Sequence, residues 1–341
     1  MSARVAAILV ALLVVLGGAA LLFQRQESGH PPEAAAALGK RVLPDLKAAE
    51  VARIRIAQQT ETLTLERKED GWVIAERDGF PADFGKVRDF VLKMIELKIG
   101  QSEPIGEKDR ARLNLDASGS RVELLTSENK TLASLVVGRK YFKREVDNPD
   151  KAPADGRFVL RADAPGTVYI VSDPLAQASA KSADWIDRTA FKVEKVKTLE
   201  VRFADGAGWR IQRPGDNADW KLAGAKPGEK LDIGRANAAS YSLSLLELDD
   251  VAAKDAKQSG EMSGLDRPTI INATTLDGAS YAIKVGRTMG EDYYVTFTSS
   301  RDDAREKRLS AYTLLIPKSK LEDTLKPRAE LLEKKPAAKK K

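Results

Sequence analysis

The sequence predicts an α+β fold, in which a single N-terminal transmembrane helix precedes two tandem copies of an antiparallel-sheet-plus-helix unit. Three observations predict this fold. Residues 5–23 form an uncharged apolar run. Many later segments alternate polar and apolar residues with the period of half-buried strands. The same motifs then recur in the same order at offsets of 148 to 150 residues, which indicates an internal duplication.

The apolar run VAAILVALLVVLGGAALLF has the length of a membrane span. Nineteen residues in a helix reach about 28 Å, close to the ~30 Å thickness of the hydrocarbon core. We therefore expect residues 1–4 to form a short cytoplasmic N-terminus and residues 5–23 to form a transmembrane anchor. A short N-terminal anchor before a large soluble body places that body outside the cytoplasm. The alternative is a cleaved signal peptide with its cleavage site at Gly18 to Ala20.

Residues 24–42 are predicted to be a flexible linker, because they are rich in Pro, Ala and Gly and lack periodic apolar positions. The only histidine of the chain, His30, lies in this linker, where we expect a solvated side chain. The C-terminal residues 326–341 contain seven Lys or Arg and two Glu, and are expected to be a basic disordered tail. This tail accounts for most of the net charge of +6, so the body is nearly neutral, which argues against nucleic-acid binding.

The first copy is predicted to span residues 43–190. Its strands are VARIRIAQ, ETLTLER and GWVIAER, then RVELLTSE, LASLVVGRK, RFVLRA and TVYIVSD. Between these two groups we expect an amphipathic helix with a buried face made by Phe84, Val87, Val91, Met94 and Ile95. A second helix is expected from Pro174 to Arg188, joining the copies, because Pro is tolerated at the first helical position.

The second copy, residues 191–325, repeats this order. Its strands are VKTLEVRFA, GWRIQRP and DWKLAG, then TIINATTL, YAIKVGRT, YYVTFT and AYTLLIP, and the buried face of its helix is expected to contain Ile233, Ala236, Leu243 and Leu246. Strands joined by short polar turns favour antiparallel sheets, each with one face covered by a helix.

Two pairs of matched residues are candidate site residues. Asp83 and Asp232 each precede a predicted helix, where an Asp side chain accepts hydrogen bonds from the first turn, so we interpret both as helix caps. Trp72 and Trp220 lie in alternating strands, which suits core residues beneath the helices. A binding platform for a sugar or peptide is the alternative for both rings.

The motifs of common enzymes are missing from the sequence. The chain has no cysteine, no histidine after position 30, no G-x-S-x-G nucleophile motif and neither of the two nucleotide-binding glycine patterns. Gly138 and Gly286, in two VGR tripeptides, suit a bulge or turn better than a phosphate loop. The acidic stretch from Glu145 to Gly156 lacks the register of a calcium loop. We therefore expect a non-enzyme with no catalytic, cofactor-binding or metal-binding residues, and no cofactor.

Several of these stretches together resemble the domain-of-unknown-function 4340 family. They are the RIRI and GWVI strands, the PADFGKVRDFVLKMIEL helix, the LNLD and VGR steps and the DWIDRTAF junction, within residues 43–325. The resemblance implies a single-pass protein of the bacterial inner membrane with its body in the periplasm. The family is similar to the auxiliary part of gliding-motility-type ABC transport systems. This similarity implies a separate membrane permease and ATPase as partners. It carries over no catalytic or binding residues.

The expected function is therefore a membrane-anchored accessory subunit of an ABC-type transport or cell-envelope system, in contact with the lipid bilayer and with a membrane-protein partner. An envelope-binding module that holds a glycan or peptide between the two repeats is the alternative. A periplasmic hydrolase that uses only carboxylates is a third interpretation, without a motif to locate its site.

Overall fold

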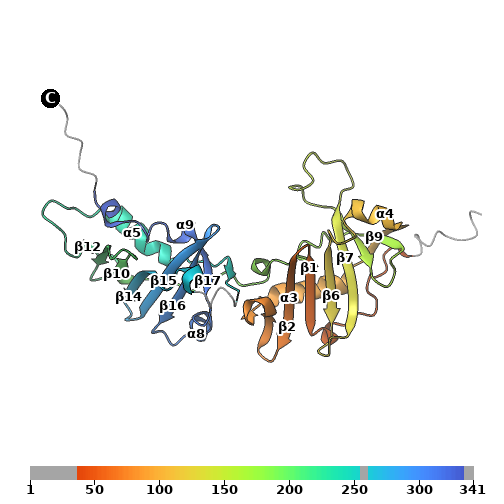
Figure 1. Cartoon of the computed structure of the whole chain (residues 1–341), viewed down its shortest axis with the longest axis horizontal. Coiled ribbons are helices and arrows are strands. Elements are labelled where there is room, and N and C mark those ends of the chain that lie inside the picture. The colour runs from red at the N-terminus through yellow and green to blue at the C-terminus, as the bar shows by residue number, and fades with distance from the viewer. Residues whose placement is uncertain (1–36, 254–259, 334–341) are drawn as a thin grey trace, which may run out of the picture. The chain divides into compact units, whose positions relative to one another are not determined.

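The computed structural model describes residues 37–253 and 260–333 (Figure 1). The predicted anchor at 5–23 lies outside the described residues, as do most of the linker and positions 334–341. Within the described part of the chain, no helix combines the length and apolarity that a membrane crossing needs. By its contacts the chain forms two compact units, unit 1 (Met1–Thr62 and Arg88–Ala180) and unit 2 (Leu63–Val87 and Lys181–Lys341).

The first sheet has nine strands in the order β4-β3-β2-β1-β6-β7-β8-β9-β5. Its registered pairs are antiparallel. The strands are β1 (Arg53–Gln58), β2 (Glu61–Lys68), β3 (Gly71–Ile74), β4 (Phe80–Pro81), β5 (Ile99–Pro104), β6 (Ser120–Leu125), β7 (Thr131–Tyr141), β8 (Gly156–Arg161) and β9 (Thr167–Val171).

The second sheet has eight strands in the order β12-β11-β10-β14-β15-β16-β17-β13, again antiparallel. The strands are β10 (Val196–Arg202), β11 (Gly208–Gln212), β12 (Lys221–Leu222), β13 (Asp250–Val251), β14 (Thr269–Thr275), β15 (Ser280–Met289), β16 (Asp292–Ser299) and β17 (Leu314–Pro317). The expectation of sheet-rich, antiparallel architecture is confirmed. The two orders correspond strand for strand, except that β4 has no counterpart.

The correspondence extends to single residues. Val137 pairs with Val159, and after an irregularity in the ladder Lys140 pairs with Arg157. In the second sheet Val285 pairs with Val295, and after the same irregularity Thr288 pairs with Tyr293. The valine of each VGR tripeptide belongs to the last regular pair before the irregularity, so the glycine and arginine of the tripeptide lie within the irregularity. A β-bulge is therefore built at the same point of both copies.

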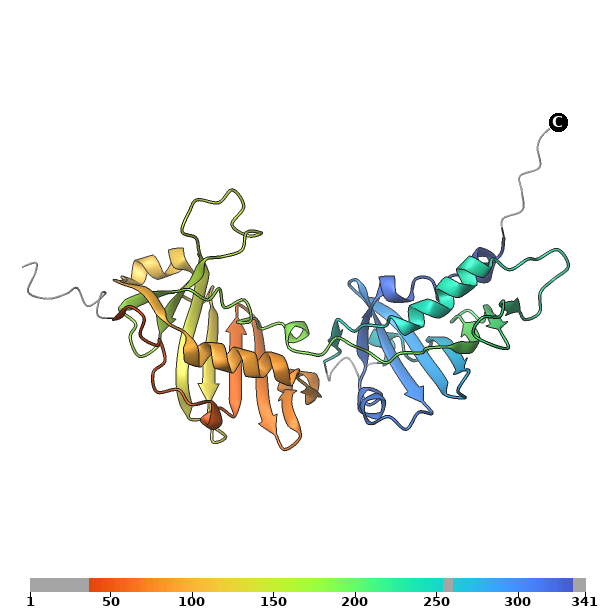
Figure 2. The same ribbon diagram turned by 180° about the vertical axis from the view of Figure 1, so that it is seen from behind.

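One long helix covers a face of each sheet: α3 (Phe84–Glu96), orange in Figure 2, and α5 (Ile233–Tyr241), teal in the same view. The buried side chains of α3 are Val87, Phe90, Val91 and Met94. The prediction that Phe84 faces the core is wrong, since its side chain is 60% exposed. Phe90 occupies the middle of the buried stripe, and at 100° per residue Phe84 lies about 120° away from it.

The predicted linking helix from Pro174 to Arg188 is also wrong. This segment contains only a 3-10 turn, Ser182–Asp184. Leu175 has a φ of 46°, in the left-handed region, and its N–H donates to Asp173 Oδ1 at 2.7 Å. The Asp173 side chain therefore closes a local turn, and the backbone leaves the helical region where the helix was expected to begin.

The prediction of a disordered tail from residue 326 is wrong for residues 326–333. A 3-10 helix, Arg328–Leu331, precedes the end of the described residues, and Leu331 is fully buried. The Lys326 carbonyl accepts from Trp209 Nε1 at 2.8 Å, and the Leu331 carbonyl accepts from the Asp232 N–H at 2.9 Å. The segment was predicted to be disordered because of its basic composition, which gives no indication that Leu331 is buried.

The remaining helices are short. They are η1 (Ala48–Glu50), η2 (Ala75–Arg77), α4 (Glu107–Arg110), η3 (Ala111–Leu113), η5 (Ser242–Ser244), α7 (Gly260–Ser263), α8 (Ala304–Leu309) and α9 (Lys318–Leu321).

Candidate functional site

Asp83 and Asp232 lie in equivalent places, each immediately before the long helix of its copy. Asp83 Oδ1 accepts from the Lys86 N–H at 3.2 Å, and Asp232 Oδ1 accepts from the Arg235 N–H at 3.2 Å. Both bonds satisfy a main-chain donor of the first turn, which has no partner inside the helix. This geometry accounts for both carboxylates without any ligand.

Trp72 and Trp220 are both buried, with 9% and 3% of their surface exposed. The Trp220 ring also has two partners of its own. Its Nε1 donates to Asn237 Oδ1 at 2.9 Å, and the Arg213 guanidinium lies 4.6 Å from its ring centroid. A stacking platform for a sugar needs an open ring face, and these rings offer little of one. Core packing explains both positions better.

The glycines of the two VGR tripeptides allow two chain segments to approach closely. A Cβ atom at Gly138 would lie 2.3 Å from the Leu113 carbonyl oxygen, and one at Gly286 would lie 2.1 Å from the Ser263 carbonyl oxygen. The turn residue that follows, Asn114 in one copy and Gly264 in the other, has a positive φ of 53° or 69°. The repeated glycine is therefore needed by the scaffold itself.

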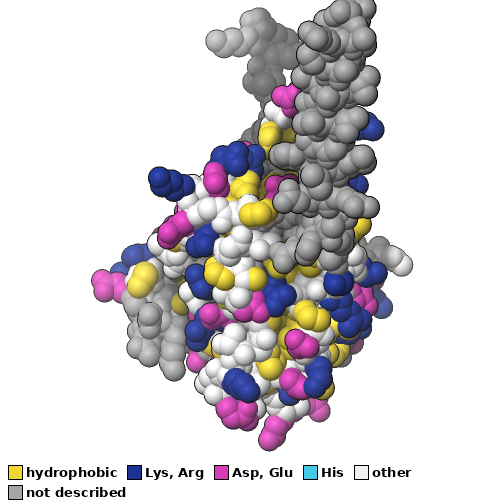
Figure 3. All heavy atoms as spheres, turned by 90° about the vertical axis from the view of Figure 1, so that its right-hand side faces the viewer, with side chains coloured by type: hydrophobic (Ala, Val, Ile, Leu, Met, Phe, Trp, Pro, Cys, Tyr) yellow, Lys and Arg dark blue, Asp and Glu magenta, His cyan; other side chains and the backbone are white. Residues whose placement is uncertain are grey.

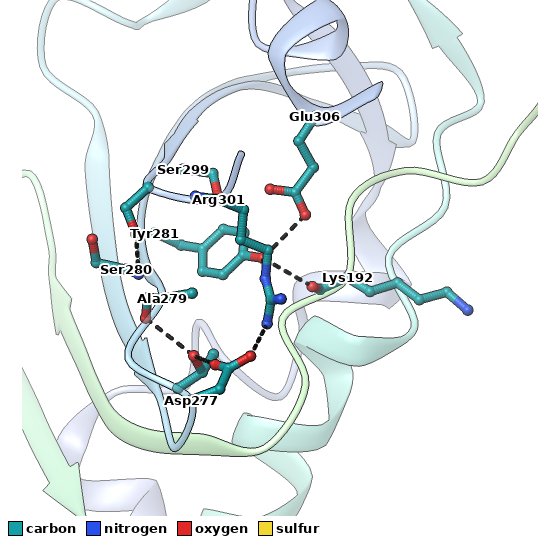
Figure 4. Close-up of polar contacts among 10 residues, drawn as sticks. Lys192, Asp277, Ala279, Ser280, Tyr281, Ser299, Arg301 and Glu306 are labelled. Carbon is teal, nitrogen blue, oxygen red and sulfur yellow. Dashed lines mark hydrogen bonds and ion pairs between the residues drawn. The ribbon is translucent and has the colours of Figure 1, made fainter. Parts of the chain in front are cut away.

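A polar cluster surrounds the buried Tyr281 in unit 2, as Figure 4 shows. Arg301 Nε donates to the Tyr281 hydroxyl at 2.6 Å, and this hydroxyl donates to Glu306 Oε1 at 3.0 Å. A second arginine nitrogen of Arg301 donates to Asp277 Oδ2 at 2.8 Å. The cluster thus ties the β14–β15 turn to the residues after β16 and to helix α8.

Burial raises the pKa of the Tyr281 hydroxyl, and the neighbouring Glu306 carboxylate raises it further. The hydroxyl therefore stays protonated near neutral pH, as a donor to Glu306. A nucleophilic or basic tyrosine would need the opposite shift. The contacts of this cluster are explained by the fold. Sequence reasoning did not find it, because its members come from separate segments with no recognisable spacing.

A groove of about 670 Å³ runs beside the end of α5 and is lined by Lys192, Lys195, Arg213, Tyr241 and Leu245, among others. Tyr241 is 64% exposed and Leu245 is 49% exposed. The position equivalent to Tyr241 in the first copy is Leu92, which lies on α3 and is 44% exposed. The long helix of each copy therefore carries a large apolar side chain on its outer side, at the same place in the repeat.

Charged side chains of both signs are interspersed on the face of the molecule drawn in Figure 3, with hydrophobic side chains between them. On the part of this face that the grey atoms leave visible, the side chains form no broad basic stripe of the kind that nucleic acid requires. Within residues 37–253 and 260–333, no group of three or more His, Asp or Glu side chains is arranged to hold a metal ion.

Comparison with known proteins gives one match. A family model described as "Domain of unknown function (DUF4340)" matches residues 72–268. Searches of curated proteins and of solved structures find no significant match. The matched range runs from Trp72 in β3 through α3 and β9 of the first copy, and through the second copy as far as the residues before β14.

Proposed function

Because the chain belongs to the domain-of-unknown-function 4340 family, we propose that it is a non-enzymatic accessory protein, anchored in the bacterial inner membrane by residues 5–23. Its body lies in the periplasm and binds a membrane-protein partner, a permease of the ABC type or another envelope component. The apolar N-terminal run supports the anchor, since its length matches a bilayer span.

The observation that carries the proposal is that some matched residues of each copy have a structural role and others have none. The matched aspartates, tryptophans and glycines serve capping, packing and close approach of the main chain. The matched outer positions Leu92 and Tyr241 serve none of these needs, and both expose large apolar side chains. Tyr241 and the exposed Leu245 line the same groove, and an exposed apolar patch is typical of a protein-binding surface.

We define the Leu92 and Tyr241 positions as the outer helix positions. The occupant that we propose for them is the periplasmic part of the membrane partner. Tyr and Leu bury large apolar areas on contact, and cationic side chains beside Tyr241, Lys192 and Lys195 among them, supply the polar rim of such an interface.

Site-specific photocrosslinking in intact cells tests the proposal. A photoreactive amino acid at position 92 or at position 241 is expected to crosslink to an integral membrane protein. The matched controls are positions 130 and 205, which are exposed residues in hairpin turns of the first and second copies. Crosslinking to no membrane protein from either outer helix position, or equally from the control positions, would contradict the proposed interface.

Topology needs a separate measurement. A reporter that is active only in the periplasm, fused after Lys341, is expected to be active. A second fusion in a chain that lacks residues 5–23 is expected to be inactive, because the body then stays in the cytoplasm. Equal activity of both fusions would rule out the anchor.

A further inference from the structure

Unit 1 contains a cationic socket at the irregular end of the β7–β8 ladder. Its volume is about 390 Å³. The charged residues that line it are Arg112, Arg139, Lys140 and Arg157, with Asp150 as the single anion. Neutral hydrogen-bonding side chains line it as well, namely Gln58, Asn114, Ser118 and Ser120. The socket therefore combines excess positive charge with several neutral donors.

Arg157 is the key residue, because nothing in the described part of the chain satisfies it. Its side chain is half-buried, and its Nε is buried without a hydrogen-bond partner. The Arg157 side chain makes no hydrogen bond or ion pair with any residue that the structure describes. Burial lowers the pKa of its guanidinium, and no neighbouring carboxylate offsets this effect. A buried cationic donor without a partner is costly, and an anion bound beside this guanidinium would offset that cost.

Lys140, the cross-strand neighbour of Arg157, differs from it because its side chain has hydrogen-bond partners in the chain. Its ammonium group donates to the carbonyl oxygens of Pro149, Asp150 and Ala152 at 3.1, 2.8 and 3.0 Å. These bonds hold the long β7–β8 loop, residues 142–155, against the socket. The contacts neutralise no charge, so Lys140 still contributes a full positive charge to the wall.

The two remaining arginines are exposed and weakly engaged. Arg139 has one hydrogen bond, from its Nη1 to the Arg112 carbonyl at 3.5 Å. Arg112 lies 4.0 Å from an Asp109 carboxylate oxygen, at the limit of an ion pair. Both guanidinium groups therefore have donors available for an anion in the socket.

The second copy shows that the scaffold does not need these charges. It builds the same bulge and the same close approach beneath it. Yet the residues equivalent to Arg112, Lys140 and Arg157 are Met262, Thr288 and Tyr293, and only Arg287 is retained, in place of Arg139. Its β15–β16 connection is also only two residues long, 290–291. Three of the four cationic side chains and the long loop are thus features of the first copy alone.

We propose that the cationic socket binds a phosphate group, carried either by free phosphate or by a phospholipid headgroup. Arginine presents its N–H donors in a planar fork that matches phosphate oxygens, and several arginines around one site suit a multiply bonded oxyanion. Asn114 and Ser120 supply further neutral hydrogen-bonding groups. This inference stands apart from the proposed accessory function, since it concerns a different surface and a different ligand.

The first test is isothermal titration calorimetry of inorganic phosphate into the full chain in neutral detergent. Wild-type protein is expected to bind one phosphate. Arg157→Tyr introduces the residue that the second copy carries on an equivalent backbone, and is expected to weaken binding roughly tenfold or more while the circular dichroism spectrum stays unchanged. Arg139→Gln should also weaken binding, whereas its matched control in the second copy, Arg287→Gln, should not.

The second test distinguishes the two sources of phosphate. The Nε–H resonance of Arg157 is followed by NMR in nanodiscs of phosphatidylcholine alone and of phosphatidylcholine with phosphatidylglycerol. A shift caused by phosphatidylglycerol without added phosphate identifies a headgroup, and a shift caused only by inorganic phosphate identifies the free ion. The proposal is overturned if neither ligand moves this resonance. It is equally overturned if both first-copy variants, correctly folded, bind phosphate as wild type does.

Discussion

Replacing Gly138 by alanine tests whether the repeated glycine is a requirement of the scaffold. The added Cβ would lie 2.3 Å from the Leu113 carbonyl oxygen and 2.8 Å from Leu115 Cδ2. Real Cβ atoms essentially never approach another heavy atom within 3.0 Å, so the two segments must separate by at least about 0.7 Å. The Leu113 oxygen belongs to the main chain, and it cannot rotate away as a side chain would.

Overpacking of this kind costs about 1–3 kcal/mol, and a clash with main chain places Gly138→Ala near the upper end of that range. With a urea dependence of about 2–3 kcal/mol per molar, the unfolding midpoint should fall by roughly 1 M. Gly286→Ala should behave alike, because its Cβ would lie 2.1 Å from the Ser263 carbonyl oxygen.

The matched control is Gly166→Ala. No atom lies within 4 Å of a Cβ at Gly166, and its φ is outside the positive range. An alanine there restricts the unfolded chain and should leave stability unchanged or raise it by about 0.4–1 kcal/mol. Urea unfolding of the full chain, followed by circular dichroism, compares the variants. Equal midpoints for Gly138→Ala and Gly166→Ala would refute the argument from close approach.

Three further predictions concern caps, the tyrosine cluster and pH. Asp83→Ala and Asp232→Ala should each lower the unfolding free energy by about 1 kcal/mol, and serine at either position should restore most of this loss. Thermal unfolding measures both effects, and a loss that serine does not restore would contradict the capping role. Tyr281→Phe removes the acceptor of Arg301 inside a buried cluster and should cost about 1–3 kcal/mol in urea unfolding, so a neutral effect would show that water replaces the hydroxyl. Burial raises the pKa of the Asp292 carboxyl, and a raised folded-state pKa means that stability is lost as pH rises above the usual value of about 4. Asp292→Asn should therefore be at least as stable as wild type at pH 7, with the difference vanishing below pH 4; a difference that grows on acidification would contradict the sign.

The strands and the duplication were predictable because their signals are local and regular. Alternation along β1, β2 and β15 gives the period of a half-buried strand, and the order of matched motifs gives the repeat. Strands β5 and β13 were missed. The sequence of β5, IGQSEP, has no alternation, and β13 has only two residues.

Other features depended on interactions that periodicity does not encode. The helix expected after Pro174 is replaced by a turn that the Asp173 side chain closes. Leu331 is buried next to Leu332, which forms a β-bridge with Leu231, a position far away in the sequence. Composition alone therefore did not predict the structure of residues 326–333.

The cationic socket was missed because its arginines come from three separate elements. No motif joins Arg112, Arg139 and Arg157, and each of them alone suits a solvated surface. The comparison of the copies did contain a signal, since RFVLRA in the first copy aligns with YYVTFT in the second and the two segments differ in charge. Matched residues identify the scaffold, and this mismatch at Arg157 and Tyr293 marks the place where the surfaces of the copies diverge.

The central claim is that shared residues build the scaffold and divergent residues of the first copy bind the ligand. The most direct measurement is the urea midpoint of wild type and of Arg157→Tyr, each with and without phosphate. A ligand at about one hundred times its Kd adds about 2.7 kcal/mol to the unfolding free energy. We predict a midpoint without phosphate that is at least as high in Arg157→Tyr as in wild type, and a rise with phosphate that is larger in wild type. An Arg157→Tyr variant that is less stable without phosphate, yet gains as much from it as wild type does, would contradict the claim.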